Sequence, residues 1–333
     1  MKKTIVAQIG VGYWGPNLLR NLVLNKDCVV KIVVELSKER QNFVIENYPN
    51  IKVSDDINKI LNDPEIEAVV ISTPVESHFD ISCRMLNSGK NILVEKPMAK
   101  TFREVLEIKR IADKNNLTAM VGHTFLFNPA VRYIKKIINN GYLGQIRYIY
   151  SQRVNLGRIR NDVDALWNLA PHDISIIQYW LNEKEPIEID RVGMSYIQEG
   201  IDDVAFLTLK YSEKILANIH VSWLDPHKLR RITIIGSKKM VFYDDIAKDK
   251  VIILNKGIDK VAVLGEEMDF DTSSNFNFQY RSQGVEKPKI DGEEPLKIEI
   301  EHFINCVRKI DKCLTDADHA GKVVKILERA SLI

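Results

Sequence analysis

The stretch at residues 5–20 constrains the fold of this chain more than any other. An apolar run leads into glycines at positions 10, 12 and 15, and a helical pattern follows. A strand, a G-x-G-x-x-G turn and a helix, in that order, form the fingerprint of dinucleotide-binding folds. Gly10 permits a tight turn, Gly12 leaves room for a pyrophosphate, and Gly15 lets the helix pack closely against the strand. The free N–H groups at the start of the helix favour phosphates.

A second apolar run, at residues 29–34, ends in Glu35, about 20 residues after the last glycine. An acid at this position accepts hydrogen bonds from the adenosine ribose hydroxyls. Because its charge disfavours a 2′-phosphate, we predict NAD as the cofactor, and Arg40 leaves NADP possible. The alternative is a solvated acid at the end of a strand.

Apolar runs alternate with helical patterns through residue 122, which predicts a doubly wound parallel sheet. From residue 145 the strand patterns alternate apolar with polar residues, which predicts an antiparallel sheet with one covered face. Residues 255–295 are polar and are expected to form an extended excursion, and helical periodicity resumes at residue 296. The predicted fold class is α/β, with a Rossmann domain at residues 1–122 and a second domain at residues 123–333.

Composition adds limits on partners and location. The chain has 333 residues, 45% hydrophobic and 28% charged, with a net charge of +2, so nothing in it indicates nucleic-acid or membrane binding. The four cysteines form no C-x-x-C pair and show no metal-ligand spacing, so we expect buried free thiols and no metal. No apolar segment reaches about 18 residues, and the N-terminus runs directly into a strand. We therefore expect a cytoplasmic protein.

Three loops follow predicted parallel strands, at residues 73–78, 95–97 and 122–129. Ligands of doubly wound sheets bind beyond the carboxyl ends of the strands, where these loops lie. Lys96 directly follows a buried strand. Desolvation there would lower the pKa of its ammonium and allow it to polarise a hydroxyl or transfer a proton. The alternative is a solvated charge.

A second candidate site lies at residues 166–176. Asn168 and His172 are four positions apart, so one helix face would carry both, although Pro171 implies a helix start or a kink. Histidine can take the proton from an alcohol as hydride leaves, because its pKa lies near neutral pH. Asp173 would orient a neighbour or cap the helix. The alternative is a structural histidine.

These features in order, with Thr73-Pro74, His78 and Glu95-Lys96-Pro97 between them, resemble the glucose–fructose oxidoreductase/inositol dehydrogenase/rhizopine catabolism family over nearly the whole chain. The resemblance implies a Rossmann domain and a C-terminal domain with an open, mostly antiparallel sheet whose outer face commonly makes the oligomer contact. It also implies a tightly held NAD(P) and hydride transfer at a sugar or polyol carbon, with Lys96 beside the reacting hydroxyl and His172 as acid/base. Family members usually carry Asp where this chain has Asn168, and an amide cannot relay a proton.

Arginines gather around this second candidate site. Arg153, Arg158 and Arg160 precede it, and Arg230 and Arg231 follow Trp223. Arginine suits bidentate binding of phosphate or carboxylate, although a charged loop is the simpler interpretation. With the aromatic groups at residues 125–128, the set resembles the nucleotide-sugar branch of the family, whose members oxidise C3 of UDP-N-acetylglucosamine or its uronic acid.

The sequence therefore predicts an NAD-dependent dehydrogenase of a UDP-linked amino sugar, a homodimer or homotetramer through the C-terminal sheet. A dehydrogenase of a free polyol or monosaccharide is the main alternative, and a non-catalytic NAD-sensing regulator is a remote one. Lys96 and His172 are the expected catalytic residues. The expected cofactor contacts are Gly10, Gly12, Tyr13, Trp14, Gly15, Glu35, Thr73, Pro74, His78, Glu95, Lys96, Asn128 and Trp167. The expected substrate contacts are Lys96, Arg153, Asn155, Arg158, Asn168, His172, Trp223 and Arg230.

Overall fold

The glycine-containing stretch folds as the first strand and first helix of a Rossmann sheet, within a chain that forms two compact units. The computed structural model describes residues 2–262, 276–290 and 292–332. One unit comprises Met1–Pro129 with Gly292–Leu332, and the other comprises Ala130–Asp291. Residues 263–275, which fall within the predicted extended excursion, lie outside the described residues.

The sheet of the first unit is parallel throughout, as predicted. Its strands are β1 (Thr4–Ile9), β2 (Cys28–Val34), β3 (Lys52–Ser54), β4 (Ala68–Ile71), β5 (Asn91–Glu95) and β6 (Ala119–Gly122). Their spatial order is β3-β2-β1-β4-β5-β6. The order reverses between β1 and β4, and this switch point is where open α/β sheets bind their ligands. The loops that begin at Gly10 and Ser72 follow these two strands.

The strands of this sheet are continuously apolar because helices cover them. The helices between the strands are α1 (Gly15–Leu24), α2 (Lys38–Asn47), α3 (Asn58–Leu61), α4 (His78–Asn87) and α5 (Phe102–Lys114), with short 3₁₀ turns η1 (Val75–Ser77) and η2 (Thr124–Phe127). Every residue of β4 and β6 is buried. Helix α5 begins with a capping box in which Thr101 and Glu104 satisfy each other's backbone N–H groups. The predicted helix–strand alternation is thus confirmed.

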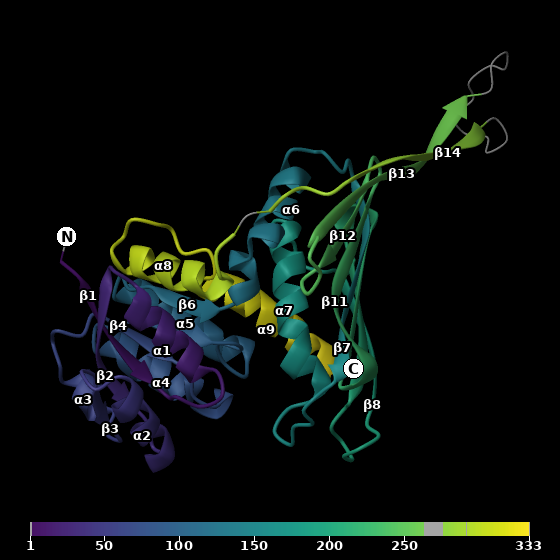
Figure 1. The fold of residues 1–333 in the computed structure, drawn as a ribbon. Coiled ribbons are helices and arrows are strands. Elements are labelled where there is room, and N and C mark those ends of the chain that lie inside the picture. Colours follow the sequence, from purple (N-terminus) through teal and green to yellow (C-terminus); the bar gives the residue numbers. More distant parts are fainter. Residues whose placement is uncertain (1, 263–275, 291, 333) are drawn as a thin grey trace. The chain divides into compact units, whose positions relative to one another are not determined.

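The last two helices belong to the first unit, which differs from the division at residue 122 predicted from the sequence. Helix α8 (Pro295–Val307) contacts α1 and η2, and helix α9 (Ala317–Ser331) packs against α5 (Figure 1). Thr315 extends the edge of β6, since its carbonyl accepts from the Val121 N–H and its hydroxyl donates to the Val121 carbonyl, both at 2.8 Å. The apolar faces of α8 and α9 are buried by helices that lie far away in sequence, so only tertiary structure reveals this return.

The second unit is built on a sheet of mostly antiparallel strands. They are β7 (Ile146–Leu156), β8 (Glu188–Met194), β9 (Val204–Tyr211), β10 (Ile215–Ser222), β11 (Leu224–Gly236), β12 (Met240–Asp244), β13 (Val251–Ala262) and β14 (Phe276–Glu286), with a 3₁₀ turn η3 (Ser212–Lys214) between β9 and β10. The order is β14-β13-β12-β11-β7-β10-β9-β8, and β10 pairs with β7 in parallel. Strand β14 lies within the predicted excursion. Its alternation of Phe276, Phe278 and Tyr280 with polar residues is a strand signal that the prediction missed.

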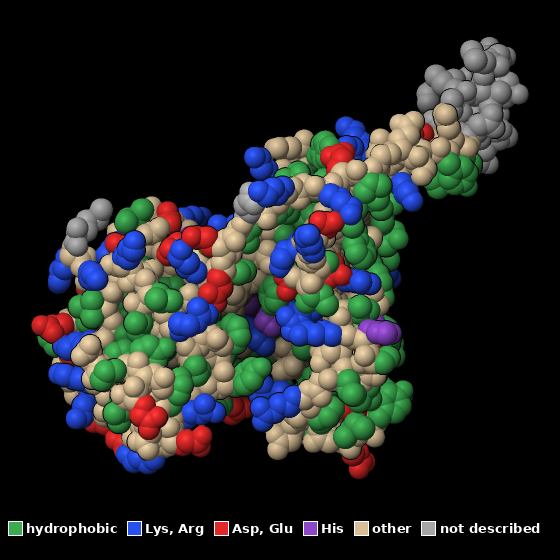
Figure 2. Space-filling view, in the orientation of Figure 1, with side chains coloured by type: hydrophobic (Ala, Val, Ile, Leu, Met, Phe, Trp, Pro, Cys, Tyr) green, Lys and Arg blue, Asp and Glu red, His purple; other side chains and the backbone are tan. Residues whose placement is uncertain are grey.

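One face of this sheet is covered and the other is open. Helix α7 (Ala165–Trp180) packs on β7, β9 and β10. Helix α6 (Pro129–Asn139) is joined to α7 by the Trp180 indole N–H, which donates to the Val131 carbonyl at 3.0 Å. Exposed hydrophobic side chains are visible over the second unit in Figure 2, as the alternating strand pattern predicts.

Candidate active site

The three glycines of the turn have three different surroundings. Gly10 has φ +88°, and a Cβ there would lie 2.8 Å from the Ser72 carbonyl oxygen. A Cβ on Gly15 would lie 2.8 Å from the Gly10 carbonyl oxygen, whereas a Cβ on Gly12 would meet no described atom within 4 Å. The protein itself therefore requires Gly10 and Gly15, and the open side of Gly12 is left for a ligand.

Hydrogen bonds fix the turn and leave the helix start uncapped. The Gln8 amide donates to the carbonyls of Gly10 and Gly15, both at 2.9 Å, and the Ser72 hydroxyl donates to Gly10 at 2.8 Å. At the N-cap of α1, Trp14 contributes no side-chain cap, and the first turn carries no acidic residue. The start of α1 thus offers N–H groups and a positive dipole end without a competing anion from those positions.

Glu35 lies beside this turn, at the end of β2. One carboxylate oxygen accepts from the Val11 N–H at 2.6 Å and the other from the Ser37 N–H at 2.9 Å. The carboxylate is therefore held next to the open glycine, where the sequence places an acid for the ribose hydroxyls. These residues fit a dinucleotide, and the role of Glu35 in holding its ribose stays a prediction.

Lys96 follows the last residue of β5, and its neighbour Glu95 is an unusual acid. Burial raises the pKa of the Glu95 carboxyl to about 7, against the opposing effects of the Lys96 charge, the Lys96 N–H and the Trp14 side chain. The Lys96 N–H donates to this carboxyl at 3.2 Å. A carboxyl that shares its proton near neutral pH beside a lysine is typical of an active site.

A second buried acid, which the sequence did not reveal, belongs to the same unit. Glu299 on α8 is fully buried and accepts from the Thr124 hydroxyl at 2.7 Å. Burial, followed by the charge of Glu95, raises the pKa of Glu299 well above its usual range. The position of Glu299 among the apolar residues of one helix face is the sequence feature that could have predicted its burial.

Two histidines complete this buried polar cluster. His123 Nδ1 and His319 Nε2 are 2.9 Å apart, and both side chains are buried. Burial, the His319 charge and the Lys96 charge lower the pKa of His123 well below its usual range. We call Glu95, Glu299, His123 and His319 the buried polar cluster. Burial thus favours the protonated form of both acids and the neutral form of His123.

The other predicted cofactor residues differ in burial. His78 is buried, and its two ring nitrogens each lie 2.8 Å from a carbonyl oxygen, of Pro97 and of Thr73. It ties the loop after β4 to the loop after β5, and burial lowers its pKa. Asn128 is also buried, whereas Tyr13 and Trp14 are exposed. Direct cofactor contact by these residues, and by Pro74, stays a prediction.

In the second unit, α7 carries the predicted His172. The helix begins after Asp164, whose side chain accepts from the Trp167 N–H at 2.8 Å, and it continues through Pro171. Pro171 therefore lies inside the helix and does not start it, and a kink there stays a prediction. Asn168 and His172 lie one turn apart on the same face.

Beneath this helix, Arg153 of β7 is held in a buried ion pair. Its Nε donates to Asp173 at 2.6 Å, and the Ser151 hydroxyl donates to the same carboxylate at 2.7 Å. Both charged side chains are at most 6% exposed. The charge of Arg153 is therefore balanced by Asp173, and a direct contact with substrate stays a prediction.

Arg230 is the second cation on this face. It pairs with Arg153 across β11 and β7, and residues opposite each other on antiparallel strands project to the same side. Burial and the Arg153 charge lower the pKa of Arg230. The structure shows no hydrogen bond or ion pair for its half-buried guanidinium among the described residues. Such a group suits an anionic ligand.

The remaining predicted substrate residues gather near the end of β7. The Trp223 indole N–H points to the Asn168 amide oxygen at 3.4 Å, and the Trp223 carbonyl accepts from the Gly157 N–H at 2.8 Å. A Cβ on Gly157 would meet the Asn155 amide at 2.7 Å, so Asn155 borders the same place. Arg158 is exposed. The structure thus brings together most of the residues predicted for substrate within this unit.

The sequence matches two family models. Residues 5–123 match the model described as "Oxidoreductase family, NAD-binding Rossmann fold", and residues 131–242 match the "GFO/IDH/MocA C-terminal domain". Together they cover more than half of the chain. The glycine turn and the first match agree on an NAD-binding Rossmann domain.

Curated relatives differ in what they act on. The 2,7-anhydro-N-acetylneuraminate hydratase of Mediterraneibacter gnavus is 26% identical over 227 residues, or 64% of this chain and 60% of that protein. The scyllo-inositol 2-dehydrogenase (NADP(+)) IolW of Bacillus subtilis is 31% identical over 145 residues, or 44% of this chain and 38% of that protein. The matches thus span at most 60% of the length of these two relatives.

A solved structure supports the fold. The UDP-N-acetylglucosamine 3-dehydrogenase GnnA of Acidithiobacillus ferrooxidans has a TM-score of 0.81 at 20% identity, covering 100% of this chain and 98% of that one. Within the described residues, no helix has both the length and the apolar character needed to cross a membrane.

Proposed function

This chain belongs to the GFO/IDH/MocA oxidoreductase family, and from that membership we propose that it is an NAD-dependent dehydrogenase of a UDP-linked N-acetylated amino sugar. It would oxidise the C3 hydroxyl of UDP-N-acetylglucosamine or its uronic acid. The family and its cofactor rest on the two matches and the glycine turn. The substrate rests on the arginines of the second unit.

In this proposal the chain's own residues bind the cofactor and accept the proton of the substrate hydroxyl. The open side of Gly12 and the start of α1 receive the pyrophosphate, and Glu35 accepts from the ribose hydroxyls. Bound NAD supplies the nicotinamide carbon that accepts the hydride. The Lys96 ammonium stabilises the developing alkoxide, and His172 takes the hydroxyl proton. Asn168 can orient a neighbour by hydrogen bonding but cannot relay the proton.

The half-buried guanidinium of Arg230 is the observation that carries the nucleotide-sugar form. It shares a sheet face with Arg153, and the latter's charge is already balanced by Asp173. A neutral cyclitol gives a partly desolvated guanidinium no counter-charge. A diphosphate or a uronate carboxylate does, through a charge-assisted hydrogen bond.

The test measures NADH formation with UDP-N-acetylglucosamine and with its uronic acid. Lys96→Ala and His172→Ala should each lower kcat by about 10²–10³ while NAD binding, followed by fluorescence, persists. Lys100→Ala, at an exposed position near Lys96, is the matched control. Full activity in both site variants would refute the assignment of these residues.

Arg230 separates the two classes of substrate. Arg230→Gln should raise KM for UDP-sugars by about tenfold to a hundredfold, the value of a charge-assisted hydrogen bond. Arg231→Gln is the matched control, because Arg231 projects to the opposite face and pairs with Asp244. Equal KM values in wild type and Arg230→Gln would remove the support for a nucleotide-linked substrate.

A dehydrogenase of a free polyol is the second candidate, favoured by the likeness to the scyllo-inositol 2-dehydrogenase of Bacillus subtilis. It predicts that a free cyclitol turns over well while UDP-sugars neither bind nor react.

We also propose that the protein is a homodimer or homotetramer through the open face of the second sheet. Phe206, Val192 and Met194 are between 44% and 69% exposed on adjacent strands of that face. An apolar surface of this kind favours burial against a second copy. Light scattering on the purified chain should give a dimeric or tetrameric mass, and Phe206→Glu should lower it; a monomeric wild type would contradict the proposal.

A further inference from the structure

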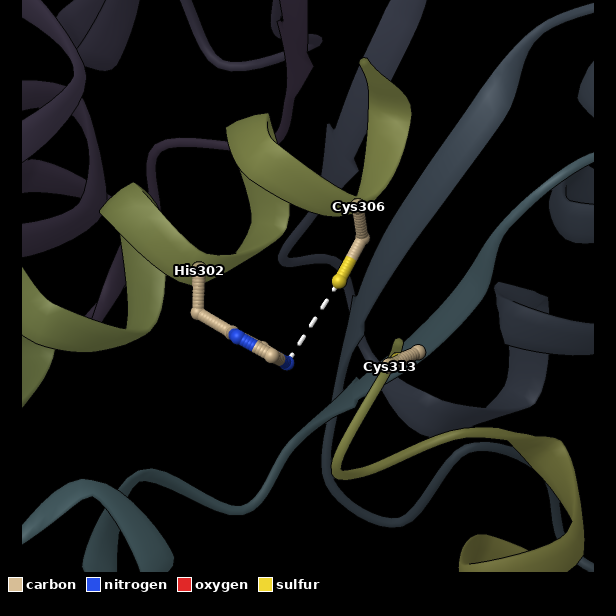
Figure 3. A group of neighbouring side chains, drawn as sticks. All are labelled: His302, Cys306 and Cys313. Carbon is tan, nitrogen blue, oxygen red and sulfur yellow. Dashed lines mark hydrogen bonds between the residues drawn. The ribbon is translucent and has the colours of Figure 1, made fainter. Parts of the chain in front are cut away.

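Three metal-binding side chains lie together in the C-terminal part of the first unit. His302 and Cys306 are one turn apart on α8, and Cys313 lies in the segment between α8 and α9 (Figure 3). One ligand atom from each falls within 4.8 Å of the others, and Cys306 Sγ is 3.4 Å from His302 Nε2. The spacing H-x₃-C-x₆-C has no C-x-x-C pair, so the sequence indicated only free thiols.

The distances suit a tetrahedral ion. With metal–sulfur bonds of about 2.3 Å and metal–nitrogen bonds of about 2.0 Å, tetrahedral angles separate sulfur from nitrogen by about 3.6 Å and two sulfurs by about 3.8 Å. The 3.4 Å between Cys306 Sγ and His302 Nε2 lies near the first value, and the Cys313 sulfur lies within 4.8 Å of both atoms. Side-chain rotations would complete the tetrahedron. Thiolate and imidazole together favour zinc over magnesium or calcium, which prefer oxygen.

A carboxylate and a backbone N–H lie beside the two ring nitrogens of His302. Its Nδ1 lies 3.6 Å from an Asp311 carboxylate oxygen, which also accepts from the Asn305 amide at 2.9 Å. The other nitrogen, Nε2, accepts from the Leu314 N–H at 3.0 Å and faces Cys306. A carboxylate beside Nδ1 recurs behind metal-bound histidines. An ion on Nε2 would displace the Leu314 N–H, because an imidazole nitrogen has one lone pair.

We propose that His302, Cys306 and Cys313 form a binding site for a zinc-class divalent ion. Binding would release the two thiol protons, and water would take the fourth position. The ion would join α8 to the segment whose Thr315 is paired with Val121 at the edge of β6. The Cys306 carbonyl of α8 also accepts from the Thr118 hydroxyl at 3.3 Å, just before β6 begins. Both elements that the ion would join are thus already hydrogen-bonded to β6 or to the residue before it. The ion therefore stabilises the first unit and takes no part in the reaction proposed above.

Cobalt titration of the full chain, stripped with a chelator and kept reduced, tests the proposal. One equivalent of Co²⁺ should produce sulfur-to-cobalt charge-transfer bands and the visible bands of a tetrahedral ion, and Zn²⁺ should displace it. Cys306→Ser, Cys313→Ser and His302→Gln should weaken binding at least a hundredfold. Asp311→Asn should weaken it about tenfold, because the carboxylate lies behind a ligand and not on the ion. Cys83→Ser, at a half-buried cysteine of the same unit outside the cluster, should bind as wild type. A spectrum without thiolate bands, or one unchanged in Cys313→Ser, would overturn the proposal.

A second measurement needs no variant. Alkylation of the reduced wild type, resolved by peptide mass spectrometry, should slow at Cys306 and Cys313 when Zn²⁺ is added and stay unchanged at Cys83. Equal rates at Cys313 with and without zinc would overturn the site even if the cysteine variants fail to fold. Neither result depends on the activity of the enzyme, so failure here is distinct from failure of the proposed function.

Discussion

The glycine turn of the first unit and the arginine face of the second are built in opposite ways. The turn is local: Gly10, Gly12 and Gly15 lie within six positions, and the ends of β2 and β4 join them through Val34, Glu35 and Ser72. The arginine face is assembled by register, which places Arg153 of β7 beside Arg230 of β11 under a helix. A glycine turn of this kind is encoded by spacing along the chain, whereas the arginine face proposed for substrate depends on how distant strands pair.

The sharpest contrast between the two regions concerns their ion pairs. Asp173→Asn leaves Arg153 with an uncompensated buried charge and should destabilise the protein by about 3–5 kcal/mol. Glu294→Gln, which loosens the exposed pair with Arg20 in the first unit, should cost at most about 1 kcal/mol. Urea unfolding measures both. Equal losses would mean that the arginine face is not held by its buried acid.

The buried polar cluster gives the first unit a pH dependence of its own. The pKa of Glu95 is about 7 in the folded chain against 4.5 ordinarily, so between these values the folded state holds a proton that the unfolded state has lost. Folding stability from this group is therefore greatest below pH 4.5, falls as pH rises to about 7, and is flat above. Relative to Glu95→Gln, the wild type should lose up to about 3 kcal/mol across this window.

Unfolding measured at several pH values checks this slope. Glu301→Gln, at an exposed position on α8 near the cluster, serves as the control and should track the wild type. A difference between wild type and Glu95→Gln that does not vary with pH would contradict the raised pKa.

The smallest effects separate two glycines of the same turn. Gly10→Ala should destabilise the protein by about 1–2 kcal/mol or more, because its backbone is left-handed and the new Cβ meets the Ser72 carbonyl. Gly12→Ala should leave stability within about 0.5 kcal/mol but weaken NAD binding at least about tenfold, since the methyl group enters the space for the pyrophosphate. Thermal unfolding and NAD titration measure the pair. Unchanged NAD affinity in Gly12→Ala would refute the placement of the cofactor.

The sequence alone determined the parallel sheet, the glycine turn and the acid at the end of β2. Continuous apolar runs and glycine spacing are local properties of the sequence. The apolar runs must be buried inside the sheet, and the glycines permit the tight turn after the first strand. The antiparallel pattern of the second sheet and the apolar character of its open face are equally local, because alternation along a strand decides which side chains share a face.

Only the tertiary structure decided the rest. It returned α8 and α9 to the first unit, which brought Glu299 and His319 to the buried polar cluster and Cys313 to the pair His302 and Cys306. It also turned Arg153 inward to Asp173 and left Arg230 without such a partner in the described chain. These contacts join residues that are far apart in sequence, so no periodic pattern along the chain predicts them. The free energy that selects them comes from burying apolar helix faces, and the ligand and proton chemistry depends on which polar groups that burial draws together.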